Sequence, residues 1–463
     1  MPKKPSLNIS IKSFEWDYLG FGLCRAWITQ WMLLPIPMLS TWKISAELLY
    51  FIPAACACLV LALFLRGKDM RKSRTFILIV SALLSCIGIT LIAIGSSGKF
   101  VVPMALGLLS VGIAAALLQT LWGDRLSCLP SNQASFYTVC AFLLSAFLSI
   151  FAWSAGSLGT ALLLFCALPI GSYILLFRGF RSGEWEEACT FSWTETTKET
   201  HDPVHLGRFC ISILVFVIVF NLAYRQLLPG ASFEGSGHPL RSIANIVVMA
   251  ALLVVVVATG RFNRMGLYRL SFPVLIGALL LLLFIPAEYA FVASTTAAIG
   301  YKLFDVLFWC VLVEIVHGDR KSAWKVLGFG MAANLGGMGL GMGAGWLFEL
   351  LPNAAMPDLP VVVCLLMFSL VIVVILILPE SLLAQFSFHE SKKGKGPLAF
   401  SFADRCAAVA EDHLLTARER DVLNLLAQGR TQSVIARKLG IGEGTAHTHI
   451  VHVYQKLGIH SQQ

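Results

Sequence analysis

Long apolar runs dominate the chain up to about residue 380, and short polar stretches separate them. A helix that crosses the hydrocarbon core of a bilayer needs roughly 20 mostly apolar residues. By this criterion the pattern predicts twelve membrane-spanning helices, at 18–38, 46–65, 75–94, 101–121, 134–153, 160–177, 207–228, 242–259, 270–286, 288–316, 324–350 and 360–378. After residue 378 charged residues, glycine and proline become frequent, which indicates a change of environment.

The composition agrees with a membrane protein. Of the 463 residues, 57% are hydrophobic and only 13% are charged, whereas soluble domains have about 25% charged residues. The net charge is +9. If the N-terminus is inside, sixteen Lys and Arg residues fall in inner loops and only Lys43, Lys99 and Arg241 in outer loops. The positive-inside rule therefore predicts a multi-pass protein of the cell (inner) membrane with both termini in the cytoplasm.

The N-terminal segment 1–17 contains Lys3 and Lys4 but no short apolar core before a small-residue cleavage site, so we expect no cleaved signal peptide. Most of the cysteines fall inside predicted spans, among them Cys56, Cys58, Cys86, Cys140, Cys166, Cys310 and Cys364. Their spacing suggests neither a disulfide framework nor a zinc site, so we expect reduced, buried side chains and no metal or cofactor.

Cytoplasmic features recur at one fixed offset. Gly123-Asp124-Arg125 closes the fourth predicted span and Gly318-Asp319-Arg320 closes the tenth, a shift of 195 residues. Two six-helix halves, 18–178 and 207–378, flank a polar loop at 179–206. In this topology the domain 18–378 resembles the major facilitator superfamily, whose two halves are parallel repeats. The resemblance implies an all-α polytopic fold with a central cavity.

Polar residues inside predicted spans are costly and mark candidate ligand contacts. They are Arg25, Gln30, Gln119, Asn221, Arg225, Lys302 and Asp305, and the resemblance places them on the helices that line the facilitator cavity. Lys302 and Asp305 are three residues apart, close enough to neutralise each other. The alternative is that these two form a structural ion pair while Arg25, Arg225 and Glu314 reach toward the membrane surfaces.

The eleventh span is rich in glycine, with Gly337, Gly341 and Gly345 in one row at four-residue spacing. Such a row permits close helix packing, which we favour over a gating hinge.

Residues 379–412 form a predicted linker with a basic run at 392–397, suited to anionic headgroups. The segment 413–463 then has the pattern of a small soluble helical domain. Thr416 and Glu419 form a capping box, Thr431 can cap a second helix that stops at Gly440, and Gly442 opens a third. Two short helices joined by a tight turn are the ingredients of a helix-turn-helix.

The tail resembles the LuxR-type DNA-binding domain. The matching residues, in order, are Leu415-Thr416, Arg418-Glu419, Val422-Leu423, Gly429, Ile435-Ala436, Leu439, Glu443-Gly444-Thr445, His449 and Lys456-Leu457-Gly458. By this resemblance, a helix from about Glu443 to Leu457 enters the major groove of double-stranded DNA. Candidate DNA contacts are Thr431, Gly444, Thr445, His447, Thr448, Val451, His452, Gln455 and Lys456.

Two departures from the LuxR pattern affect the expected binding. Ala446 and His447 stand where the family usually has Val and then Lys, and Val451 stands where some members have another Lys. Fewer fixed cations weaken nonspecific attraction to DNA. The sequence ends at Gln463, before the family's fourth helix, so the possible homodimer stays open. His447, His449, His452 and His460 do not suggest a metal site, because His449 belongs to the family pattern and His447 points elsewhere.

These patterns lead to one main hypothesis and one alternative. The main hypothesis is a membrane-embedded one-component transcription regulator, in which the facilitator-like domain senses an unknown small-molecule ligand and the tail binds DNA. The alternative is a facilitator-type transporter with a regulatory tail. No nucleophile motif, metal-ligand set or phosphate loop is visible, so we do not expect an enzyme.

Overall fold

The computed structural model describes residues 14–31, 45–65, 70–154, 158–181, 185, 203–227, 238–259, 262–286, 289–318, 322–349, 359–372, 409–410, 413, 415–427 and 431–457. The chain forms two compact units, one within residues 8–393 and one that contains residues 394–463. Most of the predicted linker, including its lysine run, lies outside the described residues.

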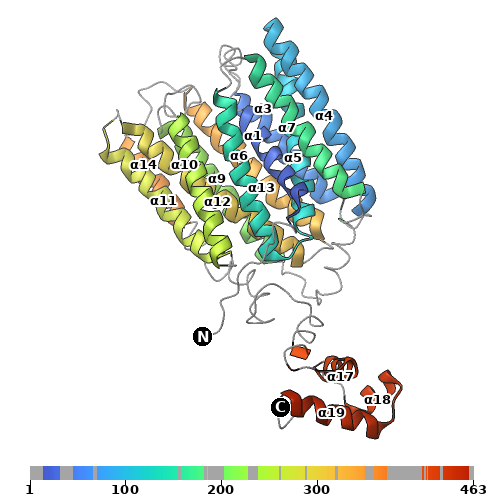
Figure 1. Cartoon of the computed structure of the whole chain (residues 1–463). Helices are drawn as coiled ribbons and strands as arrows, with labels where there is room; N and C mark the ends of the chain where they lie inside the picture. Colours follow the sequence, from blue (N-terminus) through green and yellow to red (C-terminus); the bar gives the residue numbers. More distant parts are fainter. Residues whose placement is uncertain are drawn as a thin grey trace. The chain divides into compact units, whose positions relative to one another are not determined.

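The described part of the first unit consists of helices, and their order is six plus six. The first half contains the 3-10 turn Trp16–Leu19 and the helices α1 (Gly20–Trp31), α3 (Ala46–Phe64), α4 (Met70–Gly98), α5 (Val101–Leu126), α6 (Ser131–Ser154) and α7 (Leu158–Arg181). The second half contains α9 (Pro203–Leu227), α10 (His238–Thr259), α11 (Arg264–Phe284), α12 (Ala290–Gly318), α13 (Ala323–Glu349) and α14 (Leu359–Ile372). Each helix corresponds to one predicted span, and they stand side by side in Figure 1. The predicted two-half, all-helical architecture is therefore confirmed.

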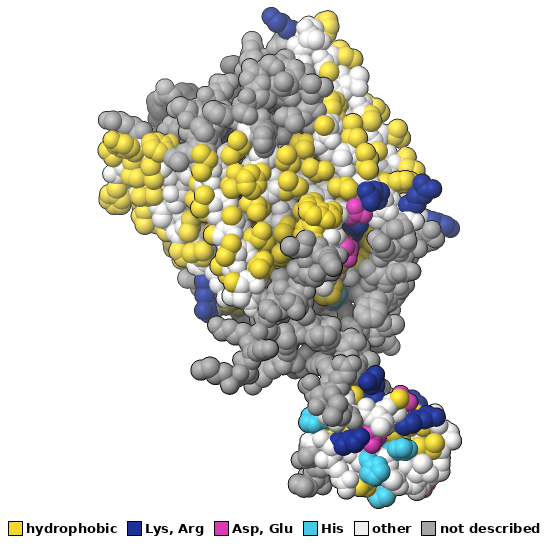
Figure 2. All heavy atoms as spheres, in the orientation of Figure 1, with side chains coloured by type: hydrophobic (Ala, Val, Ile, Leu, Met, Phe, Trp, Pro, Cys, Tyr) yellow, Lys and Arg dark blue, Asp and Glu magenta, His cyan; other side chains and the backbone are white. Residues whose placement is uncertain are grey.

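Seven of the described helices are long and apolar enough to cross a bilayer, over the ranges Ala46–Phe64, Lys72–Gly98, Val101–Leu126, Ser131–Ile150, Leu206–Arg225, Arg241–Thr259 and Arg264–Leu281. Large apolar side chains such as Phe76, Val254 and Phe368 are exposed on this unit, and Figure 2 shows hydrophobic side chains over much of its visible face. Exposure of so many apolar side chains is unfavourable in water and favourable against the acyl chains of lipids.

Several spans are longer than predicted because charged residues continue the helices beyond the apolar core. α4 begins at Met70 and α5 extends to Leu126, where Arg74 Nε donates to Asp124 Oδ2 at 2.6 Å. Both side chains are buried, so the pair fixes α4 against α5 where they meet. The repeated Gly-Asp-Arg sequence thus marks a buried ion pair in the first half, while Asp319 lies outside the described residues.

The two halves meet through α3 and α13, and through α6 with α10 and α12. Glycines on α13 make close packing possible on two sides. A Cβ atom on Gly328 would lie 2.6 Å from the Cys58 carbonyl oxygen of α3, and one on Gly341 would lie 2.6 Å from the Ile218 carbonyl oxygen of α9. The predicted packing role of the α13 glycines is confirmed.

The cysteines of the predicted spans are unpaired, as expected, but the expectation that they are buried is wrong for Cys56, Cys86 and Cys364, which are exposed. Cys128, which follows α5, is by contrast disulfide-bonded, and the sequence pattern did not predict this.

The described part of the second unit is a three-helix domain: α17 (Ala417–Ala427), α18 (Gln432–Leu439) and α19 (Glu443–Leu457). Its core contains Val422, Ile435, Ala446, Ile450 and Val453, all buried. α18 ends at Gly440, as predicted, and the φ of +66° at Gly440 makes this glycine a left-handed C-cap. The turn from Gly440 to Gly442 then reverses the chain into α19, which completes a helix-turn-helix.

Candidate DNA-binding face and central polar cluster

The domain 415–457 presents one face of α19 to solvent. The alternation of buried Ala446, Ile450 and Val453 with polar residues leaves the opposite side of the helix free. All nine predicted DNA-contact residues are exposed: Thr431, Gly444, Thr445, His447, Thr448, Val451, His452, Gln455 and Lys456. The structure therefore leaves every one of them accessible to a partner.

The start of α17 is fixed by the predicted capping box. The Thr416 amide donates to Glu419 Oε2 at 2.7 Å, and the Glu419 amide donates to Thr416 Oγ1 at 3.4 Å. Thr431 does occupy the N-cap position of α18, but its side chain makes no capping bond to the helix. The Thr431 hydroxyl instead lies 3.3 Å from the Ser433 hydroxyl. The prediction that the Thr431 side chain caps α18 is therefore wrong, although Thr431 does stand at the N-cap position.

Glu419 also joins α17 to α19. Lys456 Nζ donates to Glu419 Oε2 at 2.7 Å, and His452 Nδ1 lies 4.0 Å from Glu419 Oε1. The Lys456 ammonium and the Thr416 amide lower the pKa of the Glu419 carboxyl to about 2. Two of the predicted DNA contacts, His452 and Lys456, thus share an intramolecular carboxylate, and Lys456 would have to leave it to reach a phosphate.

Gln432, at the start of α18, was not among the predicted contacts. Its side chain donates to the Glu443 carbonyl oxygen at 3.1 Å, and its own amide oxygen lies 3.3 Å from His447 Nδ1. Gln432 is exposed, so it places an amide group beside a predicted base contact. Gln432 could have been predicted as a contact from its position in the first turn of α18, where it faces the start of α19.

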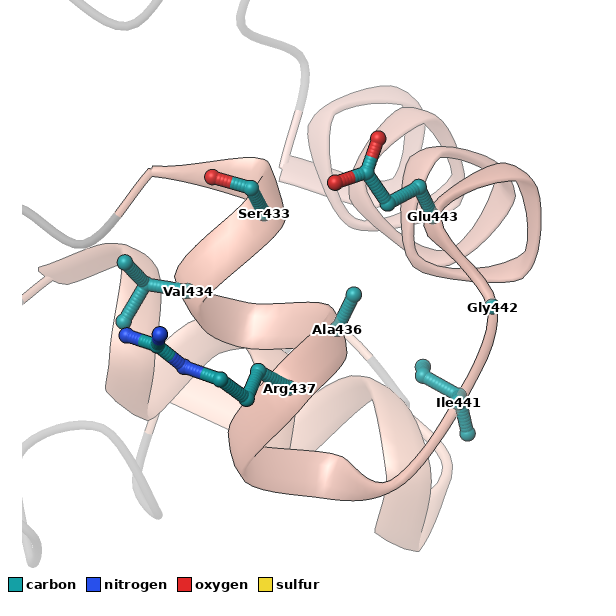
Figure 3. Close-up of a pocket in the computed structure, with 7 residues that line it drawn as sticks. All are labelled: Ser433, Val434, Ala436, Arg437, Ile441, Gly442 and Glu443. Carbon is teal, nitrogen blue, oxygen red and sulfur yellow. The ribbon is translucent and has the colours of Figure 1, made fainter.

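A pocket of about 510 Å³ lies at the turn between α18 and α19. Ser433, Val434, Ala436, Arg437, Ile441, Gly442 and Glu443 line it. In Figure 3 the Arg437 side chain extends away from Glu443, so the two charges do not pair across the pocket.

In the membrane unit, three of the predicted cavity residues meet directly. Arg25 of α1 donates through Nη1 to Gln119 Oε1 of α5 at 3.2 Å and through Nη2 to Asp305 Oδ2 of α12. Asp305 therefore pairs with Arg25 across the two halves, and the expected ion pair between Asp305 and Lys302 does not form. Arg25, Gln119 and Asp305 are all buried.

Lys302 and Tyr301 complete this group. Lys302 Nζ lies 5.8 Å from the centre of the Phe142 ring, and Arg25 Cζ lies 4.7 Å from the same ring. Tyr301 stacks on Phe220 at 4.4 Å. We call Arg25, Gln119, Tyr301, Lys302 and Asp305 the central polar cluster.

The remaining predicted cavity residues lie elsewhere. Asn221 donates to the Val217 carbonyl oxygen of its own helix at 2.8 Å. Arg225 pairs with Glu47 of α3 at 3.0 Å, a partner that sequence reasoning missed. Glu314 pairs with Arg264 at 3.1 Å, and the Gln30 side chain lies outside the described residues.

Each of the two units resembles known proteins. Residues 413–463 match the family "Bacterial regulatory proteins, luxR family". The nitrate/nitrite response regulator NarL of Escherichia coli K12 is 33% identical over 93 residues, which cover 18% of this chain and 42% of that relative. The chain thus spans less than half the length of this relative.

Solved transporters resemble the membrane unit in fold. The human organic anion transporter MFSD10 (TETRAN) has a TM-score of 0.52 at 12% identity, over 77% of this chain and 98% of that one. The major facilitator superfamily proton:xylose symporter XylE has a TM-score of 0.53 at 13% identity, over 77% and 92%. The protein therefore combines a facilitator-like membrane fold with a C-terminal LuxR-type helix-turn-helix domain.

Proposed function

We propose that the protein is a membrane-embedded one-component transcription regulator, whose facilitator-like unit senses a small-molecule ligand and whose tail binds promoter DNA. The observation that carries the proposal is the exposed polar face of α19, in a domain that matches the LuxR family. A helix-turn-helix presents such a face to base edges in the major groove. The proposed partners are double-stranded DNA, the lipid bilayer, the ligand and a second copy of the chain.

The proposed location is the inner membrane, with the tail in the cytoplasm. Basic residues support it, because Lys72, Arg125, Arg178, Arg208 and Lys325 occur at the helix ends assigned to the inside. The tail adds six basic residues against three acidic ones from Leu415 onward, which is adequate for attraction to DNA.

The proposed mechanism is a shift of population. A ligand that binds one arrangement of the two halves more tightly favours that arrangement, and the segment between Leu378 and Ala410 transmits the change to the tail. The central polar cluster supports this mechanism, because Arg25 and Asp305 link the two halves through buried charges.

DNA binding is tested by selecting sites from random duplexes with the full chain in lipid nanodiscs. We expect one enriched sequence, and at least tenfold weaker binding to it after His447→Ala or Thr448→Ala. Arg418→Ala on α17 is the matched control and should retain binding within about threefold. Failure of the full chain to enrich any sequence would contradict the regulator.

Sensing is tested by replacing residues 18–378 with an unrelated membrane anchor. If the membrane unit controls the tail, promoter occupancy in cells becomes independent of growth conditions that change it in the wild type. Occupancy that responds in the same way in both proteins would remove the sensing role.

A second candidate function is transport with a regulatory tail. The fold and the buried charges between the halves favour it, because transporters bind substrate at such positions. Substrate counterflow in proteoliposomes that is lost on Lys302→Ala or Asp305→Ala would establish transport. Ligand binding without counterflow would favour the sensor.

A further inference from the structure

The central polar cluster contains more positive than negative charge. Arg25 and Lys302 are basic and Asp305 is acidic, which gives a net charge of +1 when both bases are protonated. The Asp305 carboxylate already forms an ion pair with Arg25. Within the described part of the chain, Lys302 has neither an ion pair nor a hydrogen bond, and its cation lies over the Phe142 ring. A cation–π contact offsets only part of the cost of a charge at such a depth.

The same cluster contains buried polar atoms that are not satisfied. Arg25 Nε, Asp305 Oδ1 and the Tyr301 hydroxyl have no hydrogen-bond partner among the described residues. An unsatisfied buried donor or acceptor costs about 1–3 kcal/mol. Two of these atoms, Arg25 Nε and the Tyr301 hydroxyl, can donate, which suits an acceptor with two oxygens. Asp305 Oδ1 needs a donor, which the Lys302 ammonium can supply from the same helix.

We propose that the central polar cluster binds a small aromatic monocarboxylate by exchange of carboxylates. The ligand carboxylate replaces Asp305 on the Arg25 guanidinium, and Asp305 then pairs with Lys302, three residues away on α12. The proposal rests on the proposed ligand-sensing function and specifies its ligand. Before the exchange one cation is unpaired. After it both cations are paired and the cluster is neutral, so the incoming anion satisfies a charge that the protein alone leaves unbalanced.

The exchange changes how the two halves are joined. The bond between Arg25 of α1 and Asp305 of α12 connects the halves directly, and the ligand removes it. Other links remain, because Arg225 pairs with Glu47 and Arg264 donates to Ser131. The ligand therefore loosens the halves at the cluster while contacts elsewhere keep them associated, which is the differential effect that a population shift requires.

The aromatic surroundings define the body of the ligand. The Phe142 ring faces both cations, at 4.7 Å from Arg25 Cζ and 5.8 Å from Lys302 Nζ, and Tyr301 is stacked on Phe220. A flat aromatic group adds favourable ring contacts in such surroundings, whereas a small inorganic anion adds none. Suitable probes are benzoate and phenylacetate, with benzamide and phenylacetamide as neutral counterparts of the same shape.

The test measures binding of these four probes to the full chain in nanodiscs without DNA, by calorimetry and by thermal shift. We expect each carboxylate to bind at least tenfold more tightly than its amide. Lys302→Met should reduce carboxylate binding at least tenfold, and Lys302→Arg should restore it. Lys72→Met removes an exposed lysine at the start of α4 and is the matched control, with binding expected within twofold of wild type.

Equal binding of carboxylates and amides, or no binding of any probe, would overturn the proposal. So would equal effects of Lys302→Met and Lys72→Met. If Lys302→Met does not fold, the comparison of carboxylate with amide in the wild type still decides. Selection of a DNA site does not use these probes, so the regulator can stand when the carboxylate site fails, and the reverse also holds.

Discussion

At the scale of single residues, Glu419 determines how the tail domain is held together. Its carboxylate accepts from the Thr416 amide at 2.7 Å and from Lys456 Nζ at 2.7 Å. One side chain therefore caps α17 and also attaches α19, the helix proposed to contact DNA. Loss of its charge should weaken both connections together.

The first prediction concerns acid pH. Because the pKa of Glu419 is lowered from 4.5 to about 2 in the folded protein, its contribution to stability is present above pH 4.5 and is lost as the pH falls toward 2. Glu419→Gln should destabilise α17 and α19 at neutral pH and remove this part of the acid dependence. Hydrogen exchange of these helices in the full chain measures both effects. Parallel acid profiles for wild type and Glu419→Gln would contradict the assignment.

A pair of glycines in the tail provides a second prediction. Gly440 has a φ of +66°, so Gly440→Ala should destabilise the domain by about 1–2 kcal/mol. Gly444 lies in α19 with open space around it, so Gly444→Ala should be neutral or stabilising by about 0.5 kcal/mol. Exchange rates of α18 and α19 amides in the full chain distinguish the two. Similar losses for both variants would be inconsistent with the left-handed cap.

Sequence distance explains which of these residues could be predicted. The Thr416–Glu419 box was predictable because its partners are three residues apart on one helix start. The bond between Lys456 and Glu419 spans 37 residues, and that between Arg25 and Asp305 spans 280. In the second case the sequence spacing predicted Lys302 as the partner of Asp305, but the fold brings Arg25 of α1 into contact with Asp305 instead.

At the scale of elements, α13 makes close backbone contacts with two neighbouring helices. Gly337, Gly341 and Gly345 face α9, whereas Gly328, Gly339 and Gly343 face α3. The predicted row accounts for the first set. The second set was missed as a separate row, because a single sequence does not show that a helix has neighbours on two sides.

This packing gives a third prediction. Gly341→Ala should lower membrane-domain stability by about 1–3 kcal/mol, since overpacking forces the backbone apart. The matched variant Gly336→Ala should be nearly neutral, because its Cβ atom would lie 3.6 Å from the nearest atom, Ala55 Cβ. Thermal unfolding in nanodiscs, followed by tryptophan fluorescence, compares them. The packing argument fails if Gly336→Ala is the more destabilising.

At the scale of the whole molecule, hydropathy was sufficient to predict the twelve helices, and the Gly-Asp-Arg recurrence at an offset of 195 residues added their division into halves. Hydropathy could not predict the helix ends, because Arg74, Asp124 and Arg125 are charged and yet buried inside the fold. Paired charges of this kind are hidden from any measure that treats each residue separately.

The orientation of the chain in the membrane gives a fourth prediction. Alkaline phosphatase is active only outside the cytoplasm, so a fusion after Lys395 should be inactive and one after Ser236 should be active. Green fluorescent protein at the same two positions should give the opposite result. An active phosphatase fusion after Lys395 would show that the tail lies outside the cytoplasm, which would contradict its contact with DNA.

The two glycine faces of α13 have a mechanical consequence. On the side of α3, the Ile52 side chain occupies the space beside Gly339 and the Leu48 side chain the space beside Gly343, each within 2.7 Å of where a Cβ atom would lie. Side chains of one helix thus fill grooves of the other, which opposes sliding along the helix axis. The halves can therefore be expected to pivot about the contact between α3 and α13, rather than slide along it, when polar links elsewhere are exchanged.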